Sequence, residues 1–373
     1  MPKTIIVGAG PAGLMAARYL EDFLILEKKK EIGRPVQCAE AINKGALEKL
    51  GIKPDSSWIS STINEIELVA PSGQSFTPKA NGAGFILDRI LFEKFLAQGF
   101  EDKIKLNTKV VEIKRQNGRW KIKTESGETY DCQYLIGADG PASIVRRSIF
   151  NSSPKISPSI QYLVKTEKDI LAERIRIYFD NEKFPHGYAW VFPKSSHTAN
   201  IGLGGKGNLK ESFDYFMEKV VRKEFGNYEL IKNISGSIPS GGAKMKLFKD
   251  NALLVGDAGA LADPVFDGGI KNAMFSGKIA SECILENKAY LYEKRIKSMS
   301  FLDPDLILAK KLISSLPNSV FNVLAEIINQ ENATEVNFSK ILFLALKNPE
   351  SRKSILKLSR IFFILRKSED SFG

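Results

Sequence analysis

The chain opens with Thr4-Ile5-Ile6-Val7-Gly8-Ala9-Gly10-Pro11-Ala12-Gly13, and a second apolar run, Phe23–Leu26, ends at Glu27. An apolar strand, a glycine turn, a helix, a second strand and an acid form the unit that binds a dinucleotide. In such a unit Gly8 allows the tight turn, Gly10 lets the backbone approach a pyrophosphate, and Gly13 lets the helix pack on its strand. The free N–H groups at the start of the helix then face the phosphates. We expect Glu27 to accept hydrogen bonds from an adenosine ribose.

The composition is that of a globular protein without a disulfide or metal framework. The chain has 373 residues, 43% hydrophobic and 26% charged, which accommodates two domains or one large domain with an inserted lobe. Cys38, Cys132 and Cys283 show no paired spacing, which argues against disulfides and against a zinc site and fits a reducing compartment. His186 and His197 are the only histidines, so we expect no multi-histidine metal site.

The N-terminal sequence and the net charge indicate where in the cell the protein is expected to act. The N-terminus runs directly into the first apolar strand, so we expect no signal peptide. No apolar stretch approaches the roughly 20 residues that a membrane-spanning helix needs. The formal net charge of +11 at pH 7 suggests nucleic acid, an anionic membrane surface, or a solvated basic surface without a partner.

The pattern of strands and helices predicts an α/β fold with an interrupted dinucleotide-binding domain. A strand, helix and strand occupy residues 1–30, and the alternation resumes at Ala252–Asp257. Alternating residues and a Pro71-Ser72-Gly73 turn predict a small antiparallel sheet near 60–87. We therefore expect a discontinuous Rossmann-like domain from 1–150 and 247–290, an inserted antiparallel-sheet lobe over 151–246, and a helical, basic C-terminal region over 291–373.

Four separated motifs resemble those of a flavin-dependent family that includes para-hydroxybenzoate hydroxylase and the geranylgeranyl reductases. They are the opening glycine unit, Asp88-Arg89, Asp139-Gly140 with Ser143 and Arg146, and Gly256-Asp257-Ala258 followed by Asp263-Pro264 and Gly268-Gly269-Ile270. The resemblance implies bound FAD. It places Asp257 near the ribityl chain, Gly269 and Ile270 at a helix start beside the flavin ring, and Arg89 and Val110 on the adenosine side. The cofactor-binding residues that it implies are Gly8, Gly10, Ala12, Gly13, Glu27, Cys38, Ala39, Ala41, Arg89, Val110, Asp139, Asp257, Gly269 and Ile270.

Two further motifs resemble signatures of the geranylgeranyl reductases, closest to the archaeal members that act on digeranylgeranylglycerophospholipids. One is Pro35-Val36-Gln37-Cys38-Ala39-Glu40-Ala41-Ile42, which the resemblance places along the flavin. The other is Tyr188-Ala189-Trp190-Val191-Phe192-Pro193 with the later Gly202-Leu203-Gly204. The substrate-binding residues that the resemblance implies are Tyr188, Trp190, Phe192, Pro193, Gly202 and Gly204.

The residues themselves support an aromatic wall in this second motif. Tyr188, Trp190 and Phe192 alternate, so in a strand they share one face. Three rings on one face can line a pocket for a long apolar chain, although ordinary core packing gives the same pattern. Pro193 is expected to end the strand, which would leave the aromatic face near a loop.

Cys38 is the candidate catalytic residue, with two interpretations. It is either a small apolar residue against the flavin, or a reactive thiol or proton donor, which would need a perturbed pKa. The interval from Gly13 to Glu27 is several residues shorter than the family's usual one, which puts the ribose role of Glu27 in question.

The function that the resemblance implies is FAD-dependent reduction of double bonds in geranylgeranyl or other isoprenoid chains, in membrane ether-lipid precursors. The electron donor is NADPH, NADH or reduced ferredoxin, so an electron-donor protein is a candidate partner beside the prenylated lipid, and we expect no nucleic acid. The same fold also hosts FAD-dependent monooxygenases and halogenases of aromatic substrates, which remain an alternative. A third hypothesis is that the protein is a prenyl-lipid carrier without enzymatic activity.

The segment Ser351–Lys367 is predicted to be an amphipathic helix. Its apolar side holds Ile355, Leu358, Phe362 and Leu365, and its basic side holds Lys353, Lys357, Arg360 and Lys367. The apolar side either packs on the protein or docks on a membrane, which a lipid substrate favours. We expect a cytoplasmic protein that is peripheral on the inner, anionic face of the membrane.

Overall fold

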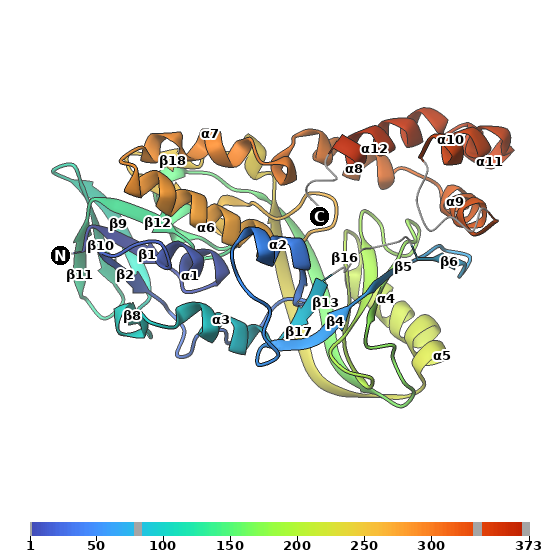
Figure 1. Cartoon of the computed structure of the whole chain (residues 1–373), viewed down its shortest axis with the longest axis horizontal. Helices are drawn as coiled ribbons and strands as arrows, with labels where there is room; N and C mark the ends of the chain where they lie inside the picture. Colours follow the sequence, from blue (N-terminus) through green and yellow to red (C-terminus); the bar gives the residue numbers. More distant parts are fainter. Residues whose placement is uncertain (1, 78–83, 331–337, 368–373) are drawn as a thin grey trace.

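The fold is mixed α/β, and the computed structural model describes it for residues 2–77, 84–330 and 338–367 (Figure 1). The described residues form four sheets, of six, seven, three and three strands. In Figure 1 the strands of the six-stranded sheet lie on the left, those of the seven-stranded sheet lie at the lower right, and a layer of helices crosses the top.

The six-stranded sheet contains both strands of the opening unit. Its order is β18-β19-β12-β1-β2-β8, with β18 antiparallel to β19 and all other neighbours parallel. The strands are β1 (Thr4–Val7), β2 (Phe23–Leu26), β8 (Ile104–Lys105), β12 (Tyr134–Gly137), β18 (Phe248–Lys249) and β19 (Ala252–Leu254). Every residue of β1, β12 and β19 is buried, which explains their unbroken apolar sequences.

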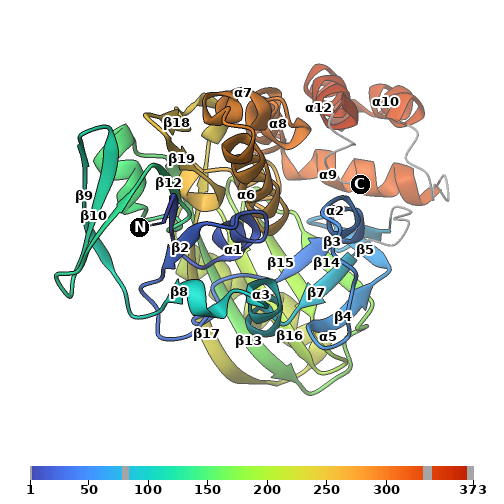
Figure 2. The same cartoon turned by 60° about the vertical axis from the view of Figure 1, so that its left-hand side comes forward.

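Helices α1 (Pro11–Ala17) and α6 (Ile270–Leu285) pack closely together beside this sheet, as Figure 2 shows. A Cβ atom at Gly277 would lie 2.2 Å from the carbonyl oxygen of Ala12, so the approach requires glycine. The Ser281 hydroxyl donates to the carbonyl of Ala16 at 2.8 Å. The other elements around this sheet are α3 (Arg89–Ala97), α7 (Tyr292–Lys297) and the three strands β9 (Val110–Gln116), β10 (Arg119–Thr124) and β11 (Thr129–Cys132).

The seven-stranded sheet has the order β17-β13-β16-β15-β14-β5-β6. Its strands are β5 (Glu65–Val69), β6 (Ser75–Phe76), β13 (Lys155–Thr166), β14 (Arg174–Tyr178), β15 (Tyr188–Pro193), β16 (Thr198–Gly204) and β17 (Tyr228–Ser240). Alternation sends Ala189 and Val191 of β15 into an apolar cluster with α4 (Leu209–Phe216) and α5 (Arg222–Phe225). The aromatic residues between them therefore face away from these helices.

The sheet expected near 60–87 is in fact divided between two sheets. Strands β4 (Ile59–Ile63) and β7 (Gly84–Leu87) join β3 (Ala41–Asn43), which leads into α2 (Lys44–Lys49), in a three-stranded antiparallel sheet. Strand β5 instead pairs in parallel with β14, from Glu65 opposite Arg174 to Val69 opposite Tyr178. The alternating pattern predicted the strands correctly but did not predict that β5 and β6 extend the larger sheet.

The C-terminal region is helical, as expected. It contains α8 (Asp305–Ile313), α9 (Asn318–Gln330), α10 (Phe338–Lys347), α11 (Pro349–Arg352) and α12 (Ile355–Lys367). The side of α12 that was considered for membrane insertion is turned inward, because Leu358 is buried and Ile355, Phe362 and Leu365 pack against the same apolar cluster. Within the described residues, none of the helices combines the length and the apolarity that a membrane span requires.

Candidate functional site

The glycine turn after β1 combines two tight contacts with one open position. Gly8 has a φ of +105°, and a Cβ at Gly13 would lie 2.0 Å from the Gly8 carbonyl oxygen. Around a Cβ placed at Gly10 there is no described atom within 4 Å. Gly8 and Gly13 therefore build the turn, while Gly10 leaves free space immediately before the first residue of α1.

Glu27 is buried at the end of β2, where it holds the glycine turn. Its Oε2 accepts from the backbone N–H of Ala9 at 2.6 Å, and its Oε1 accepts from Lys29 N–H at 2.8 Å. Each carboxylate oxygen keeps a second lone pair, which is available to accept from the hydroxyl groups of a ribose. Val110 begins β9 close by, since Thr108 N–H donates to the Glu27 carbonyl at 2.8 Å.

Asp257 offers a carboxylate that lacks a donor. It lies in the helical turn Gly256–Gly259 after β19, and no hydrogen bond from a described residue reaches its side chain. Burial raises its pKa to about 6, against the opposing effect of the Arg89 and Arg146 guanidinium groups. A Cβ at Gly269 would be 3.5 Å from Asp257 Oδ1, and Ile270 then begins α6. A half-buried acceptor without a donor fits a ligand rich in hydroxyl groups.

Arg89, the first residue of α3, is half-buried, and its guanidinium group has one donor without a partner among the described atoms. Asp88 caps the helix by accepting from the N–H groups of Ile90 and Leu91 at 3.0 Å. The Arg89 guanidinium donates to Glu93, but its buried Nε has no partner among the described atoms. Its charge acts on both Cys38 and Asp257, so the helix start faces both of these motifs.

Asp139 is engaged within its own loop. Its Oδ1 accepts from the Ser143 hydroxyl at 2.5 Å and its Oδ2 from Ile144 N–H at 2.5 Å. Arg146 then donates to the Ala258 carbonyl at 2.8 Å, which joins this loop to the Asp257 turn. These hydrogen bonds show that Asp139 positions its own loop.

Gly8, Gly10, Asp139 and Asp257, four of the residues implied for FAD, follow the carboxyl ends of β1, β12 and β19. A Cβ at Gly8 would meet the Ala138 carbonyl at 2.4 Å, and one at Gly256 would meet the Cβ of the buried Ala12 at 2.9 Å. The open space at Gly10, the Asp257 carboxylate and the orphaned Arg89 Nε are three features that a bound dinucleotide would satisfy. The described residues thus fit FAD.

Cys38 lies in the loop between this region and the seven-stranded sheet. Burial raises the pKa of its thiol, with Arg89 opposing, so the group stays protonated at neutral pH. Its Sγ accepts from Glu40 N–H at 3.2 Å. The geometry suits a neutral thiol and gives no support to a reactive thiolate.

A buried polar network, which the sequence did not reveal, joins this loop to the sheet. Gln161 on β13 donates to the Cys38 carbonyl and to Asn200 Oδ1, each at 3.1 Å, and accepts from the Trp190 indole N–H at 3.1 Å. Asn200 on β16 donates to the Ala39 carbonyl at 3.3 Å. The one available signal was that Gln161 and Asn200 are polar residues inside apolar strands, where burial demands a partner.

The network ends in an ion pair at Glu40. Its Oε2 accepts from Lys194 Nζ at 2.6 Å and from Asn200 Nδ2 at 2.8 Å, while its Oε1 accepts from Arg89 N–H at 3.2 Å. Glu40 therefore fixes the Cys38 loop to both α3 and β16. Ala41, the next residue, starts β3 and pairs with Ile86 of β7.

The three alternating aromatic residues of β15 form a row of rings on one face. The ring centroids of Tyr188 and Trp190 are 5.8 Å apart, and those of Trp190 and Phe192 are 6.3 Å apart. The Tyr188 hydroxyl donates to the Phe266 carbonyl. Phe192 also packs against β4 and β7, so this end of the row is part of an apolar cluster.

Two glycines of β16 lie opposite the aromatic row and leave space for its rings. Gly202 lies opposite Trp190 and Gly204 opposite Tyr188. A Cβ at Gly202 would be 2.6 Å from the Trp190 ring, so a side chain there would displace the indole. Pro193 ends β15, as expected, and its carbonyl accepts from the Ser61 hydroxyl at 2.5 Å.

The row continues beyond the predicted residues into the C-terminal helices. Phe179 lies 6.3 Å from Tyr188 and stacks on Phe321 of α9 at 5.7 Å with an interplanar angle of 6°. No pattern in the sequence predicts this contact, because Phe321 follows Phe179 by more than a hundred residues.

Comparisons with known proteins agree with this geometry. Residues 155–238 match the geranylgeranyl reductase catalytic domain. The chain is 31% identical to a digeranylgeranylglycerophospholipid reductase of Methanosarcina acetivorans, over 96% of this chain and 95% of the relative. A relative of the same description from Methanosphaerula palustris is 37% identical over 76% of each chain.

Solved structures share the fold. A geranylgeranyl bacteriochlorophyll reductase-like protein of Thermoplasma acidophilum has a TM-score of 0.80 and 28% identity, covering 96% of this chain and 99% of its own. The flavin-dependent halogenase CmlS has a TM-score of 0.65 at 18% identity, covering 98% of this chain and 72% of its own. At that identity the halogenase shows a common fold alone.

Proposed function

The chain belongs to the digeranylgeranylglycerophospholipid reductase family, and from this premise we propose that it saturates double bonds in the geranylgeranyl chains of a glycerophospholipid. It is a flavin-dependent oxidoreductase. FAD, when bound, supplies the hydride for such a reduction. The rest of the chemistry, which is to hold the chain, exclude water and provide a proton, falls to residues of this protein.

The cofactor would lie where the glycine turn, the Arg89 helix start and the Asp257 turn meet. Gly10 leaves room for the pyrophosphate, Asp257 is free to accept from hydroxyl groups, and Arg89 has an unused donor. We propose that residues 1–150 and 247–290 form this FAD-binding domain, that 151–246 form the substrate lobe, and that 291–373 form a helical C-terminal region. Because β5 and β6 belong to the larger sheet, the lobe would also include them.

The observation that carries the proposal is the bond between the aromatic row and the Cys38 loop. Gln161 holds the Trp190 indole and the Cys38 carbonyl at once, so the apolar wall and the loop beside the cofactor position keep a fixed relation. A prenyl chain along Tyr188, Trp190 and Phe192 would thus be presented to the flavin. The protonated thiol of Cys38 is the candidate proton donor on that loop.

Replacement of Trp190 by alanine tests the function. We expect Trp190→Ala to retain FAD absorbance, because the indole bonds Gln161 and packs between Tyr188 and Phe192, and to reduce lipid at least tenfold more slowly. Trp190→Phe, which keeps a ring on the wall, serves as the matched variant. Mass spectrometry of digeranylgeranylglycerophospholipid incubated with enzyme and dithionite measures the saturation. Hydroxylated or halogenated products, or unchanged reduction by Trp190→Ala, would contradict the proposal.

The electron donor and the location remain parts of the same proposal. A surface hollow of about 480 Å³ is lined by Lys28, Lys29, Lys30, Arg34 and Lys232 among others, next to the end of β2. Its charge supports an anionic donor, either NADPH, NADH or reduced ferredoxin. A lipid substrate further supports peripheral association with the inner face of a membrane.

A further inference from the structure

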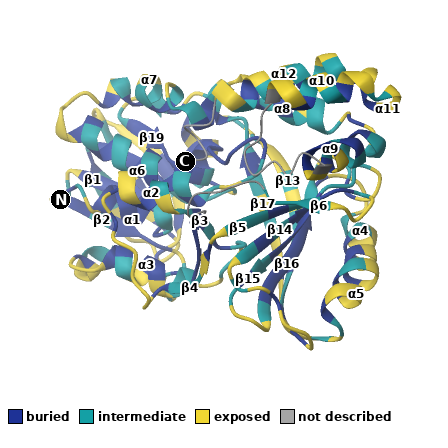
Figure 3. Ribbon diagram, turned by 45° about the vertical axis from the view of Figure 1, so that its right-hand side comes forward, coloured by how far each residue is buried: buried dark blue, intermediate teal, exposed yellow. Residues whose placement is uncertain are grey.

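The outer face of α10 and α12 carries large apolar side chains that nothing in the described structure covers. Phe343 and Leu346 on α10 are 57% and 47% exposed, and Leu356 and Phe363 on α12 are 82% and 71% exposed. The two helices contact each other, and Figure 3 shows exposed residues along the outer side of both. Single exposed apolar residues are ordinary, whereas four on neighbouring helices indicate an interaction surface.

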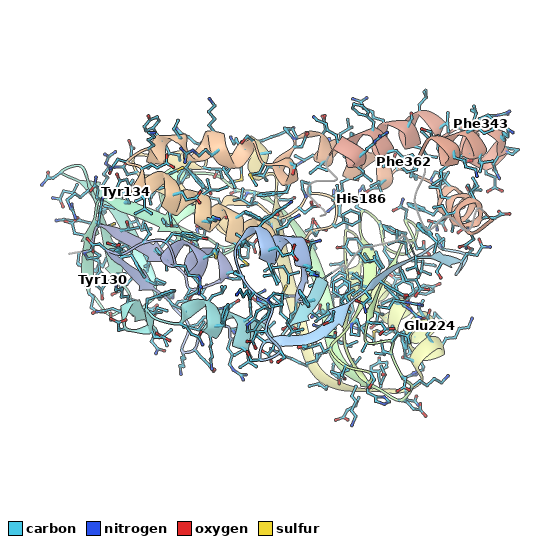
Figure 4. All side chains as sticks on the ribbon, viewed as in Figure 1. Tyr130, Tyr134, His186, Glu224, Phe343 and Phe362 are labelled. Carbon is cyan, nitrogen blue, oxygen red and sulfur yellow. The ribbon has the colours of Figure 1, made fainter. Side chains whose placement is uncertain are left out.

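This surface is not the one that amphipathicity predicted. The predicted side of α12 is directed into the protein, where Leu358, Ile361 and Ile364 are buried. Figure 4 labels Phe343 on α10 and Phe362 on α12 within the upper layer of helices. Phe362 packs against the internal cluster, while its neighbour Phe363 faces outward, so two adjacent phenylalanines serve opposite sides of one helix.

Basic residues alternate with the apolar ones on the exposed side of α12. Lys353, Leu356, Arg360, Phe363 and Arg366 follow one another at intervals of three or four residues, so they form one stripe along and just before the helix. Residues 338–367 contain eight lysines and arginines and one glutamate. Among the described residues, Lys367 has an ion pair with Asp303 at 2.8 Å, whereas Lys353, Arg360 and Arg366 have none.

We propose that this docking face, comprising Phe343, Leu346, Leu356 and Phe363 with Lys353, Arg360 and Arg366, binds the surface of an anionic lipid bilayer. Apolar tips enter the interface while guanidinium and ammonium groups meet the lipid head groups. Charge complementarity argues against a second copy of the chain as the occupant, because two such faces would bring like charges together. The inference rests on the proposed function, which requires the enzyme to reach a bilayer lipid.

Packed apolar side chains beneath the docking face extend to the aromatic row of β15. The apolar cluster that buries Leu358 and Ile361 also includes Phe321 of α9. Phe321 stacks on Phe179 at 5.7 Å, and Phe179 lies 6.3 Å from Tyr188. A bilayer bound at α10 and α12 would therefore be connected by packed apolar side chains to the wall proposed to hold the prenyl chain.

Co-sedimentation with vesicles tests the docking face. The probes are vesicles of phosphatidylglycerol with phosphatidylcholine, and of phosphatidylcholine alone, at low and high salt. We expect the wild-type protein to bind the anionic vesicles at least tenfold better at low salt and to lose this preference at high salt. Leu356→Ser combined with Phe363→Ser should reduce binding to anionic vesicles at least tenfold, and Arg360→Gln combined with Arg366→Gln should remove the preference for them.

Matched controls come from exposed residues elsewhere. Leu230→Ser with Ile231→Ser alters two residues of β17 that are 48% and 51% exposed, and Lys121→Gln with Lys123→Gln alters two exposed lysines of β10. Both controls should bind vesicles like the wild type. Because all these side chains are exposed, thermal unfolding should be unchanged in every variant, which separates loss of binding from loss of fold.

Equal vesicle binding by the Leu356/Phe363 variant and the wild type would overturn the proposal, as would absence of binding by the wild type. A wild-type dimer that this variant converts to a monomer, without vesicle binding by either, would assign the face to a second copy and also overturn it. Reduction of detergent-dispersed lipid is measured separately. If the wild type lacks that activity, the proposed function fails, whereas the vesicle result still decides the docking face.

Discussion

The variant Gly10→Ala should weaken FAD binding without destabilising the fold. No described atom lies within 4 Å of a Cβ at Gly10, so Gly10→Ala should change the stability of the apoprotein by less than about 0.5 kcal/mol. The methyl would occupy the space proposed for the pyrophosphate, so we expect FAD to bind at least tenfold more weakly. Fluorescence titration with FAD and thermal unfolding of the apoprotein measure the two effects.

Gly13→Ala is the contrasting variant. Its Cβ would lie 2.0 Å from the Gly8 carbonyl oxygen, so this change should destabilise the fold itself. Unaltered FAD affinity in Gly10→Ala would place the pyrophosphate elsewhere.

The Asp257 carboxylate should destabilise the apoprotein and strengthen the binding of FAD. Burial raises its pKa from 3.8 to about 6, so the folded state holds a proton that the unfolded state releases between these values. Stability from this group therefore falls as pH rises through that window, by roughly 2 to 3 kcal/mol in total. Asp257→Asn should make the apoprotein more stable by that amount at pH 8, with no gain at pH values below about 4.

Urea denaturation of apoprotein at the two pH values measures this effect. FAD affinity should fall in the same variant, because an amide is a poorer acceptor than a carboxylate for hydroxyl groups. A less stable apo Asp257→Asn protein at pH 8 would show that the carboxylate already has favourable partners.

At the scale of the strands, Gln161 joins the aromatic row of β15 to the Cys38 loop through hydrogen bonds. Gln161→Leu would leave the Trp190 indole N–H and the Asn200 Oδ1 atom without their present partner, at a cost of about 1–3 kcal/mol. We expect normal FAD content, altered Trp190 fluorescence and slower lipid reduction. Gln116→Leu, at an exposed position of β9, is the control and should alter none of these. Loss of FAD from Gln161→Leu would mean that the network supports the cofactor rather than the substrate wall.

The elements differ in how far the sequence could predict them. The opening unit was predicted because its signals are local: an apolar run, a glycine turn, and a second apolar run that ends at an acid. The segment Glu65–Val69 was recognised as a strand but placed in the wrong sheet, because its partner β14 is distant in sequence and periodicity carries no information on pairing. Gln161 and Asn200 were missed for the same reason.

The C-terminal helix shows a different limit. Its hydrophobic pattern predicted one apolar side correctly, and that side is packed inward. Leu356 and Phe363 fell outside the pattern, and only the arrangement of α8, α9 and α10 around α12 decides which side remains uncovered.

At the scale of the whole molecule, we expect the C-terminal helices to unfold independently, while the FAD-binding part stays folded. Deletion of residues 351–373 removes Leu358, Ile361 and Ile364, each of which contributes about 1.5–3 kcal/mol when buried. We expect lower helical content by circular dichroism and an early unfolding transition, while FAD remains bound because the six-stranded sheet and its turns are intact. A truncated protein with a single transition at the wild-type temperature would contradict this division.

The parallel pairing of β5 with β14 also has a consequence during synthesis. Arg174 follows its partner Glu65 by 109 residues, so β5 leaves the ribosome roughly 5–22 s before β14 at about 5–20 residues per second. Throughout that delay one edge of β5 is open to other nascent chains. The carboxylates of Glu65 and Glu67, which later bond Arg174 and Arg176 at 2.6 and 2.7 Å, keep the waiting strand charged. The same acids that finish the sheet thus protect it from aggregation while it is being translated.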